Sequence, residues 1–451
     1  MLFHNKKLRL SYTQYIALGF LLLILLGGIL LTFPFMSRNG QWTPFGDALF
    51  TATSATCVTG LVVHDTYTYW STGGQILILI MIQIGGIGFM TVIALFALLS
   101  KRQISLHERK LLMQSAGAIK VGGIVQLVKQ ILLITVCIEG TGALLLALRF
   151  CRDPQIGIGK GIYFAIFHSI SAFCNAGFDM MGSASLQYAS LTAYQMDPVV
   201  NFTIMALIIL GGLGFIIWND LSKNKWHFQK YALHTKLSLT ATAILVLGGA
   251  ILFFLFEYSH TQSGMNIWQR IMVSLFDSIT PRTAGFNTSD MTQFNDSSTL
   301  LTIILMFIGA NPGSTAGGIK TTTFIVLILS IKATCNHSPG ISIFKRKLEE
   351  SIARQAAAIA TIYLIAIFAV SMIICAIEPY SMKEVLFETT SAAGTVGLTL
   401  GMTPSLGSIS RLLLILLMYG GRIGGLTLAL VLAEKREYVP LERPTEKILI
   451  G

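Results

Sequence analysis

Four short stretches of the sequence carry residue types that could hold a cation without a charged side chain. Each contains a Leu-Phe or Ile-Phe pair, and nine or ten residues after that Phe stands a glycine with a bulky apolar residue behind it: Gly60-Leu61, Gly177-Phe178, Gly285-Phe286 and Gly397-Leu398. Glycine adopts backbone dihedrals that are closed to other residues. Successive carbonyl oxygens can then point toward one axis and replace the hydration shell of an ion. The pattern therefore predicts a cation-selective filter made of main-chain oxygens.

The predicted filter strands are the residues that lead up to these glycines. They are Thr56, Cys57, Val58, Thr59 and Gly60; Cys174, Asn175, Ala176 and Gly177; Arg282, Thr283, Ala284 and Gly285; and Thr395, Val396 and Gly397. The last strand is close to the Thr-Val-Gly-Tyr-Gly loop of potassium channels. We expect a short helix before each strand, whose partly negative C-terminal end favours a cation. Because the copies share only one glycine, we expect fewer well-formed ion sites and weaker exclusion of sodium than in a filter of four identical strands.

Residues 309–318 interrupt an apolar run with four glycines and one proline. In a helix these residues would cost about 7 kcal/mol relative to alanine, so the helix should break there. Irregular backbone at membrane depth must line a cavity, and we therefore predict a movable gate below the filter; the alternative is a plain membrane kink. The predicted gate residues are Gly309, Asn311, Pro312, Gly313, Ser314, Thr315, Gly317, Gly318, Lys320 and Arg422.

Five charged residues within apolar segments have competing interpretations. Burying the charges of Lys320 and Arg422 at such depth costs free energy, so these two residues are predicted to be functional. The alternative is that their side chains snorkel toward the membrane surface. For Asp277 and Glu388, structural hydrogen bonds behind the filter are favoured over a role in attracting cations. Glu139 is interpreted as a satisfied buried carboxyl rather than a proton relay.

The elements that must position these residues are membrane-spanning helices. Of the 451 residues, 53% are hydrophobic and 12% are charged, and a soluble domain would carry about twice that charge. The apolar runs that reach or approach the roughly 20 residues needed to cross a bilayer lie near 13–35, 73–99, 123–149, 196–218, 236–257, 298–331, 355–376 and 408–433. A short semi-apolar stretch, long enough for half a bilayer, separates the members of each pair.

The repetition predicts an all-α integral membrane protein with eight transmembrane helices and four re-entrant pore helix-loops. They form four parallel helix–pore loop–helix repeats with pseudo-fourfold symmetry around one pore. The helix after the filter repeats as well, with the glycine pairs Gly85-Gly86, Gly211-Gly212 and Gly420-Gly421, for which close helix packing is an equally good explanation. The predicted repeats span 1–99, 100–218, 219–331 with the gating loop 309–318, and 332–451 with a short cytoplasmic tail.

The distribution of charge predicts the orientation. With the N-terminus inside, the inner segments hold 21 Lys and Arg against 8 Asp and Glu, whereas the outer segments hold 8 basic and 12 acidic residues. Basic residues accumulate on the cytoplasmic side of membrane proteins, so both termini are predicted to be cytoplasmic. The net charge of +11 is then explained by topology and requires no nucleic-acid partner, while basic clusters such as 345–347 can contact membrane lipid.

These motifs resemble the membrane subunit of the Trk/Ktr/HKT superfamily of potassium transporters, and most closely the bacterial KtrB type. The resemblance implies that Gly60, Gly177, Gly285 and Gly397 are the filter glycines, that residues 309–318 are the intramembrane loop, and that Arg422 is the arginine below the filter. It implies potassium uptake across the bacterial plasma membrane, with sodium considered as an activator. It also implies a homodimer with one pore per subunit and a regulatory cytoplasmic ring of RCK-type nucleotide-binding subunits.

Two other functions remain as alternatives. A sodium-coupled or alternating-access cation carrier would use its broken helix to bind substrate at the midplane, but carriers have two related halves and this chain has four parallel quarters. An intramembrane enzyme is not expected, because His-Glu-x-x-His and Gly-x-Ser-x-Gly motifs are missing. No covalent cofactor is expected. No nucleotide site is expected on this chain either, because its longest inner segment has about 23 residues, too few for a nucleotide-binding domain.

Overall fold

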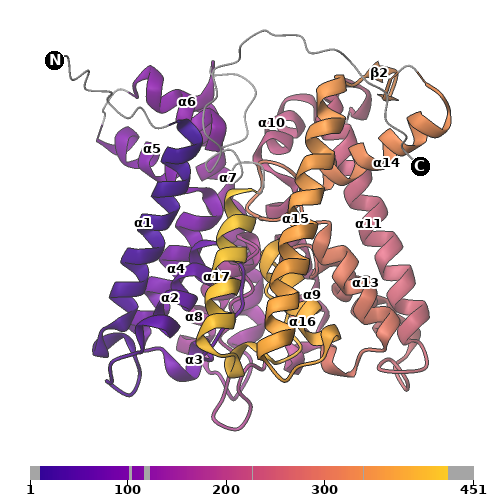
Figure 1. Ribbon diagram of the computed structural model, residues 1–451. Coiled ribbons are helices and arrows are strands. Elements are labelled where there is room, and N and C mark those ends of the chain that lie inside the picture. Colours follow the sequence, from indigo (N-terminus) through magenta and orange to yellow (C-terminus); the bar gives the residue numbers. More distant parts are fainter. Residues whose placement is uncertain (1–10, 101–103, 116–121, 226, 339, 425–451) are drawn as a thin grey trace.

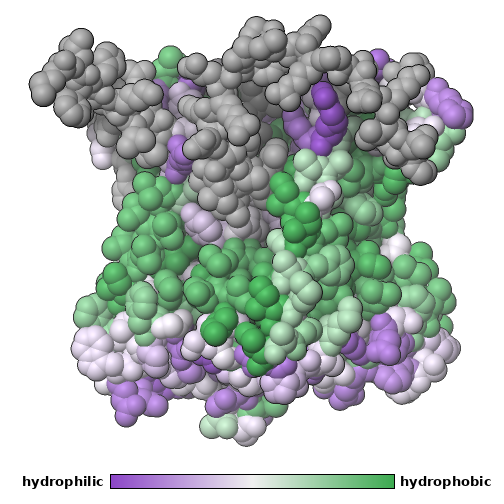
Figure 2. All heavy atoms as spheres, in the orientation of Figure 1, coloured by the Kyte–Doolittle hydropathy of each residue, from purple (hydrophilic) through white to green (hydrophobic). Residues whose placement is uncertain are grey.

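The computed structural model describes residues 11–100, 104–115, 122–225, 227–338 and 340–424, and nearly all of its regular secondary structure is helical (Figure 1). Within these residues, four helices are long and apolar enough to cross a membrane unbroken. Leu22, Leu133, Ile244 and Ile365, one on each of these helices, are more than half exposed, as expected of side chains that face lipid. Figure 2 shows hydrophobic residues around the middle of the molecule and hydrophilic ones along its lower edge. The long helices are α1 (Tyr12–Thr32), α7 (Ile124–Phe150), α11 (Leu233–Glu257) and α15 (Glu350–Ile377).

Each long helix is followed by a shorter one that ends at a predicted filter strand. These pore helices are α2 (Phe45–Thr56), α8 (Ile158–Phe173), α12 (Ile267–Ile279) and α16 (Met382–Gly394). Their local sequences explain two of the starting points: Asn266 with Gln269 and Ser381 with Glu384 form capping boxes that satisfy the first free N–H groups. The order long helix, pore helix and strand occurs four times, so the predicted repetition and the all-α membrane fold are confirmed.

The helices after the filter are shorter, and short elements lie in the connections between helices. The former are α4 (Thr72–Ile87), α5 (Phe89–Leu99), α9 (Pro198–Leu213), α10 (Phe215–Asn224), α13 (Asp296–Phe307), α14 (Thr321–Cys335) and α17 (Ser408–Ile423). The latter are α3 (Thr66–Tyr69), α6 (Leu106–Ser115), the hairpin β1 (Ser342–Ile343) with β2 (Arg346–Lys347), and 3₁₀ turns at Pro34–Met36, Thr192–Tyr194, Phe228–Lys230, Met291–Gln293 and Thr403–Ser405.

Two predicted spans are bent, contrary to the expectation of a single helix over 73–99 and 196–218. α4 and α5 meet at 97°, and α9 and α10 meet at 93°. The bends lie at Gly88 and Gly214, whose φ angles of 90° and 97° end the first helix of each pair, and glycine alone adopts such angles readily. α17 ends in the same way at Gly424, with a φ of 98°.

The rest of the predicted eighth span, the C-terminal tail and the N-terminal residues 1–10 lie outside the described residues. The helix after the third filter departs from the other three. Its two parts, α13 and α14, are separated by residues 308–320. This segment contains the predicted loop 309–318, and from here on the whole segment is called the intramembrane loop.

The paired glycines bring the helices after the filter against the pore helices. A Cβ atom added to Gly85 would lie 2.0 Å from the Thr56 carbonyl oxygen, and one added to Gly211 would lie 1.9 Å from that of Phe173. The corresponding distance from Gly421 to the Ala393 oxygen is 2.3 Å. Any side chain at these positions would push the two helices apart, so close packing explains this glycine of each pair.

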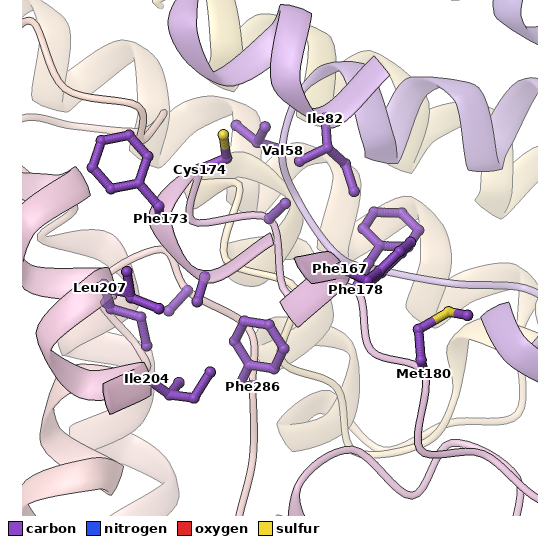
Figure 3. Packing of buried hydrophobic residues seen from close by; sticks show 14 of the residues in the cluster. Val58, Ile82, Phe167, Phe173, Cys174, Phe178, Met180, Ile204, Leu207 and Phe286 are labelled. Atoms are coloured by element: carbon purple, nitrogen blue, oxygen red, sulfur yellow. The ribbon is translucent and has the colours of Figure 1, made fainter. Parts of the chain in front are cut away.

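The core surrounds the filter strands. Figure 3 shows buried apolar side chains from three repeats gathered around the second strand, among them Val58, Phe173, Cys174 and Phe286. The first and fourth repeats are joined by Arg411 at the start of α17, which donates to the Asp47 carboxylate on α2 at 2.5 Å. His64 lies 3.0 Å from the other oxygen of the same carboxylate. These contacts connect the first repeat to the fourth, so the four repeats close into a ring.

The bend at Gly214 generates a first prediction. Gly214→Ala should lower the thermal stability of the purified protein, because a left-handed backbone costs a residue with a side chain about 1–2 kcal/mol. Its Cβ would also lie 2.7 Å from the Pro312 carbonyl oxygen. We expect a drop in unfolding temperature of a few degrees in detergent, measured by intrinsic fluorescence.

The matched control is Gly248→Ala in the middle of α11, where an added Cβ meets no atom within 4 Å. Alanine favours a helix over glycine there, so stability should be equal or higher. Equal unfolding temperatures for the two variants would contradict the structural reason given for the bend.

Candidate functional site

The four predicted filter strands meet around one axis. A Cβ atom added to any of the four shared glycines would collide with the carbonyl oxygen just before the shared glycine of the next repeat. The distances are 2.6 Å from Gly60 to Ala176, 2.8 Å from Gly177 to Ala284, 2.5 Å from Gly285 to Val396 and 2.0 Å from Gly397 to Thr59. The contacts run in chain order and return to the first repeat, so the glycines form a closed ring.

The backbone of the strands has the same unusual conformation in all four repeats. The shared glycines have φ angles between 70° and 97°. The residue two positions before each glycine is also left-handed, although none of the four is glycine: Val58 (51°), Asn175 (57°), Thr283 (66°) and Thr395 (52°). Such conformations cost side-chain-bearing residues about 1–2 kcal/mol each and are concentrated at functional sites. This feature has no signal in the sequence, because the four residue types share nothing that predicts it.

Main-chain oxygens remain available at the ring. In the part of the chain that the structure describes, no hydrogen-bond donor occupies the carbonyl oxygens of Thr59, Ala176, Ala284 and Val396. Buried carbonyl groups are nearly always paired in proteins. Four unpaired oxygens around one axis are therefore suited to coordinate a dehydrated cation.

Hydroxyl groups in the pore helices hold the strands in place, and the prediction from sequence missed them. Ser54 and Ser391 each accept a hydrogen bond from the N–H of the glycine six residues later, both at 3.0 Å. Ser171 donates to the carbonyl oxygen of Phe178 at 2.7 Å, and Thr280 donates to that of Phe286. The signal was present, since a hydroxyl stands five or six residues before every shared glycine.

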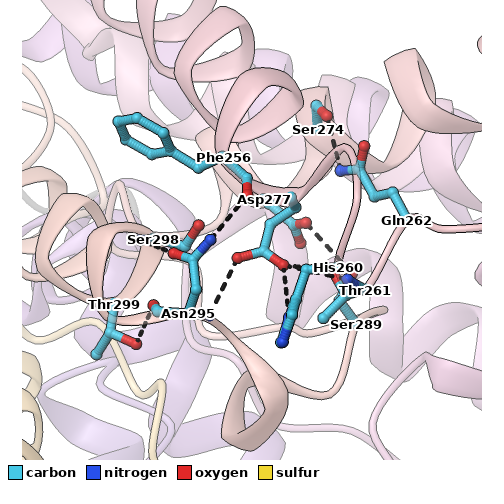
Figure 4. Close-up of polar contacts among 11 residues, drawn as sticks. Phe256, His260, Thr261, Gln262, Ser274, Asp277, Ser289, Asn295, Ser298 and Thr299 are labelled. Carbon is cyan, nitrogen blue, oxygen red and sulfur yellow. Dashed lines mark hydrogen bonds and ion pairs between the residues drawn. The ribbon is translucent and has the colours of Figure 1, made fainter.

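The residue after the Phe of the pore helix braces the segment that follows the filter in three repeats. His168 accepts the N–H of Met180 at 3.3 Å, and Asp277 accepts the Ser289 hydroxyl at 3.3 Å (Figure 4). Glu388 accepts the hydroxyls of Thr399, at 2.7 Å, and of Thr403. Asp277 and Glu388 thus make the hydrogen bonds behind the filter that were favoured for them. Glu139 is likewise a satisfied buried carboxyl, which accepts the Gln83 amide at 3.1 Å.

The intramembrane loop lies against the C-terminal ends of the pore helices. Its Thr315 hydroxyl donates to the Phe173 carbonyl oxygen at 3.1 Å, and a Cβ on Gly317 would lie 2.2 Å from the Thr395 hydroxyl oxygen. The loop also bonds to the helices after the filter, through Asn311 to Gly212 at 3.1 Å and Gly318 to Gly421 at 3.0 Å. The loop is therefore packed against the second and fourth repeats, at the end of the filter toward which the pore helices point.

The two predicted gate cations bind carbonyl oxygens of this region. Arg422 donates to the Thr315 carbonyl oxygen of the loop and to those of Gly85 and Gly86 in the first repeat. Lys320 donates to Ala316 and Gly317 at 2.8 and 3.0 Å. Lys320 turns back into its own loop, so the snorkelling alternative is wrong for it.

The structure places Arg282 differently from the other predicted filter residues. Its main chain follows the third strand, but its side chain points away from the other strands and donates to the Thr321 hydroxyl at 3.1 Å. The side chain lines a small cavity together with Thr242, Gly212 and Ala310. A guanidinium group has no acceptor atoms, so this side chain contributes no ligand to a cation, and the filter prediction for Arg282 concerns its main-chain oxygen alone.

Comparisons with known proteins agree with this architecture. Residues 20–439 match the model of the TrkH family, which is described as a cation transport protein. The chain is 40% identical to the potassium/sodium uptake protein NtpJ of Enterococcus hirae, over 98% of both chains. It is 39% identical to the Ktr system potassium uptake protein B of Bacillus subtilis, over 99% of this chain and 98% of that one. The crystal structure of the potassium transporter TrkH from Vibrio parahaemolyticus has the same fold, with a TM-score of 0.75, 18% identity, and coverage of 95% of this chain and 86% of that one.

The glycine ring generates a second prediction. Gly60→Ser, Gly177→Ser, Gly285→Ser and Gly397→Ser should each reduce discrimination among alkali cations or the apparent affinity for them, about tenfold for a strain of 1–2 kcal/mol. Gly397→Ser should have the largest effect, because its Cβ has the shortest contact. The measurement is uptake of competing alkali cations into proteoliposomes.

Gly140→Ser is the matched control, since an added Cβ on this α7 residue meets no atom within 4 Å. Its affinity and selectivity should equal those of the unmodified protein. If all four ring variants insert normally and retain unchanged affinity and selectivity, the filter assignment is wrong.

Proposed function

The chain belongs to the TrkH family of cation transport proteins, and we propose that it is the ion-translocating subunit of a potassium uptake system of the Trk/Ktr type. The observation that carries this proposal is the closed ring of four glycines, each facing a free carbonyl oxygen of the next repeat. Membership of a transporter family sets the chain apart from enzymes. The names of the two curated relatives, a potassium/sodium and a potassium uptake protein, support potassium as the substrate.

In the proposed mechanism the main chain replaces the water around the ion. The carbonyl oxygens of the four strands coordinate the dehydrated cation, and the C-terminal ends of the pore helices add a favourable partial negative charge. Left-handed residues two positions apart let the carbonyl groups between them point inward. Hydrogen bonds that Ser54 and Ser391 accept, and that Ser171 and Thr280 donate, hold this conformation against relaxation.

The strands differ in side chain, and the third has one residue fewer between its Phe and its glycine. The four carbonyl oxygens at the glycine ring, one from each strand, therefore have different surroundings. This asymmetry supports moderate selectivity for potassium over sodium, in accord with a relative named for both ions.

The intramembrane loop is the proposed gate. It lies on the ion path below the filter, where its backbone and the positive charges of Lys320 and Arg422 form a barrier in series with the filter. Arg422 joins the loop to the first repeat, so breaking this contact removes the link between the loop and that repeat and weakens the hold on its resting position. Since most of its hydrogen bonds run to neighbouring helices, a movement of those helices is transmitted to the loop.

The proposed assembly follows the family resemblance. Both termini lie in the cytoplasm, the chain resides in the bacterial plasma membrane as a homodimer, and a separate RCK-type ring provides nucleotide control. The interrupted helix of the third repeat also fits a cation carrier with alternating access. The dependence of potassium flux on the potassium and sodium gradients distinguishes a pore from a carrier. A channel-like pore conducts potassium down its own gradient without coupled sodium.

Potassium uptake in bacterial cells that lack other uptake systems is the test of the function. Expression of the chain together with an RCK-type subunit should restore growth at low external potassium, and the chain alone should give slower uptake. The Gly397→Ser variant is the negative control. Absence of any potassium-dependent rescue, with protein present in the membrane, would refute the proposal.

The gate generates a further prediction. Shortening the loop within residues 312–317, and separately Arg422→Ala, should raise the maximal rate of potassium flux and leave the half-saturating concentration nearly unchanged. Charge-assisted hydrogen bonds contribute roughly 1.5–3 kcal/mol, so we expect about a tenfold increase for Arg422→Ala. Because both changes remove the same contact, their combination should be less than additive.

Rates should be measured in proteoliposomes and normalised to the amount of protein inserted. Arg354→Ala removes a positive charge from α15, outside the loop, and so controls for the effect of charge loss alone. A shortened loop that inserts normally and conducts no faster than the unmodified protein would exclude a gating role.

A further inference from the structure

Arg282 is a buried cation that has no carboxylate partner among the described residues. Arg282 is 5% exposed, and its Nε has no hydrogen-bond partner within the described part of the chain. The cavity beside it has a volume of about 10 Å³, which is space for about one water molecule. Burying a charge without a counter-charge is costly, so the position of this guanidinium depends strongly on the few polar groups that it does reach.

The polar group that Arg282 reaches is the hydroxyl of Thr321, the first residue of α14. Thr321 is fully buried. Its hydroxyl accepts from Nη2 of Arg282 at 3.1 Å and donates to the Gly309 carbonyl oxygen at 2.8 Å. Its N–H donates to the Ala310 carbonyl oxygen at 3.0 Å. Thr321 thus joins the two ends of the intramembrane loop and ties both to the third filter strand.

The remainder of the loop is attached elsewhere. The Gly313 carbonyl oxygen accepts from Phe215 of the second repeat at 2.9 Å, and Gly318 donates to Gly421 of the fourth. Arg422 holds the carbonyl oxygen of Thr315. The base of the loop is therefore bound to its own repeat through Arg282, whereas its outer part is bound to other repeats.

A second connection runs from the same filter strand to the loop. The Asn175 side-chain amide donates to the Arg282 carbonyl oxygen and to the Thr283 hydroxyl, both at 3.4 Å. Its oxygen accepts the Thr315 hydroxyl at 3.3 Å. A displacement of the third strand is therefore transmitted to the loop at its base and in its middle.

We propose that Arg282 and Thr321 form the anchor about which the intramembrane loop moves, and that through them the third filter strand sets the resting position of the loop. Arg282 is in this view a positioning residue of the gate rather than an ion ligand. Loss of the anchor detaches the base of the loop from the third filter strand, leaves its backbone bonds from Thr321 to Ala310 and from Asn311 to Gly212, and lets the loop shift out of the ion path. The inference rests on the proposed gating role of the loop and adds the residues that hold its base.

The test uses a conservative pair of substitutions at Thr321. Thr321→Val keeps the shape but removes the hydroxyl, and so both of its hydrogen bonds; Thr321→Ser keeps the hydroxyl. In proteoliposomes with the full chain, Thr321→Val should raise the maximal potassium flux about three- to tenfold, the effect expected from one or two lost hydrogen bonds. The half-saturating concentration should stay within about twofold. Thr321→Ser should behave like the unmodified protein.

A second measurement reports on the loop directly. Ser314 is half-buried and its hydroxyl has no partner among the residues that the structure describes, so Ser314→Cys places a thiol in the loop without breaking a hydrogen bond seen there. Modification of this thiol by a polar thiol reagent, followed by mass spectrometry of the purified protein, should be several-fold faster when combined with Thr321→Val. Thr334→Val on the exposed part of α14, whose hydroxyl bonds only to Ser330 of its own helix, is the matched control and should change neither readout.

The outcomes separate the two proposals. If Thr321→Val changes neither the flux nor the modification rate while loop shortening raises the flux, the anchor is refuted and the gate stands. If Thr321→Val speeds modification of residue 314 but neither it nor loop shortening raises the flux, the anchor stands and the gate is refuted. If Thr321→Ser is as fast as Thr321→Val, the effect does not come from the hydroxyl and the anchor is refuted.

Discussion

The fold depends on four glycines that approach the main chain of the next repeat more closely than any side chain allows. Each brings one pore-helix end to the axis, and the same device recurs one layer further out, where Gly85, Gly211 and Gly421 touch the last carbonyl groups of the pore helices. Lipid tails are as apolar as the helices, so the hydrophobic effect does not drive the helices together in a membrane. Close packing at small residues and interhelical hydrogen bonds must hold them together instead. The filter and the bundle are thus stabilised by the same kind of contact.

This shared basis explains which parts could be read from the sequence. Glycines that permit close approach, apolar runs and the break at 309–318 leave compositional signals, and the predicted helices and strands rest on them. The bends at Gly88 and Gly214 escaped prediction because a glycine that packs and a glycine that ends a helix have the same sequence signature. Only the backbone shows φ angles near 90° there.

The left-handed conformation of Val58, Asn175, Thr283 and Thr395 could not be predicted at all. It is imposed from outside each strand, by the hydroxyl of the pore helix on one side and the neighbouring repeat on the other, and not by the residue that adopts it. For the same reason Arg282 was grouped with the filter: its main chain belongs there, and only the packed structure shows that its side chain turns to Thr321.

Two departures from fourfold symmetry, the intramembrane loop of the third repeat and Arg422 of the fourth, contact each other. Arg422, Gly86 and Gly212 occupy the same place, two residues before the glycine that ends the helix. At Gly86 a Cβ would lie 2.6 Å from the Cys174 sulfur, so no side chain fits there. In the fourth repeat the side chain extends instead to the loop that the third repeat supplies. One arginine suffices to bond one loop, and four would surround the central axis with positive charge. A chain that carries its four repeats in one polypeptide can place a single cation at this level, which a filter assembled from identical subunits cannot do.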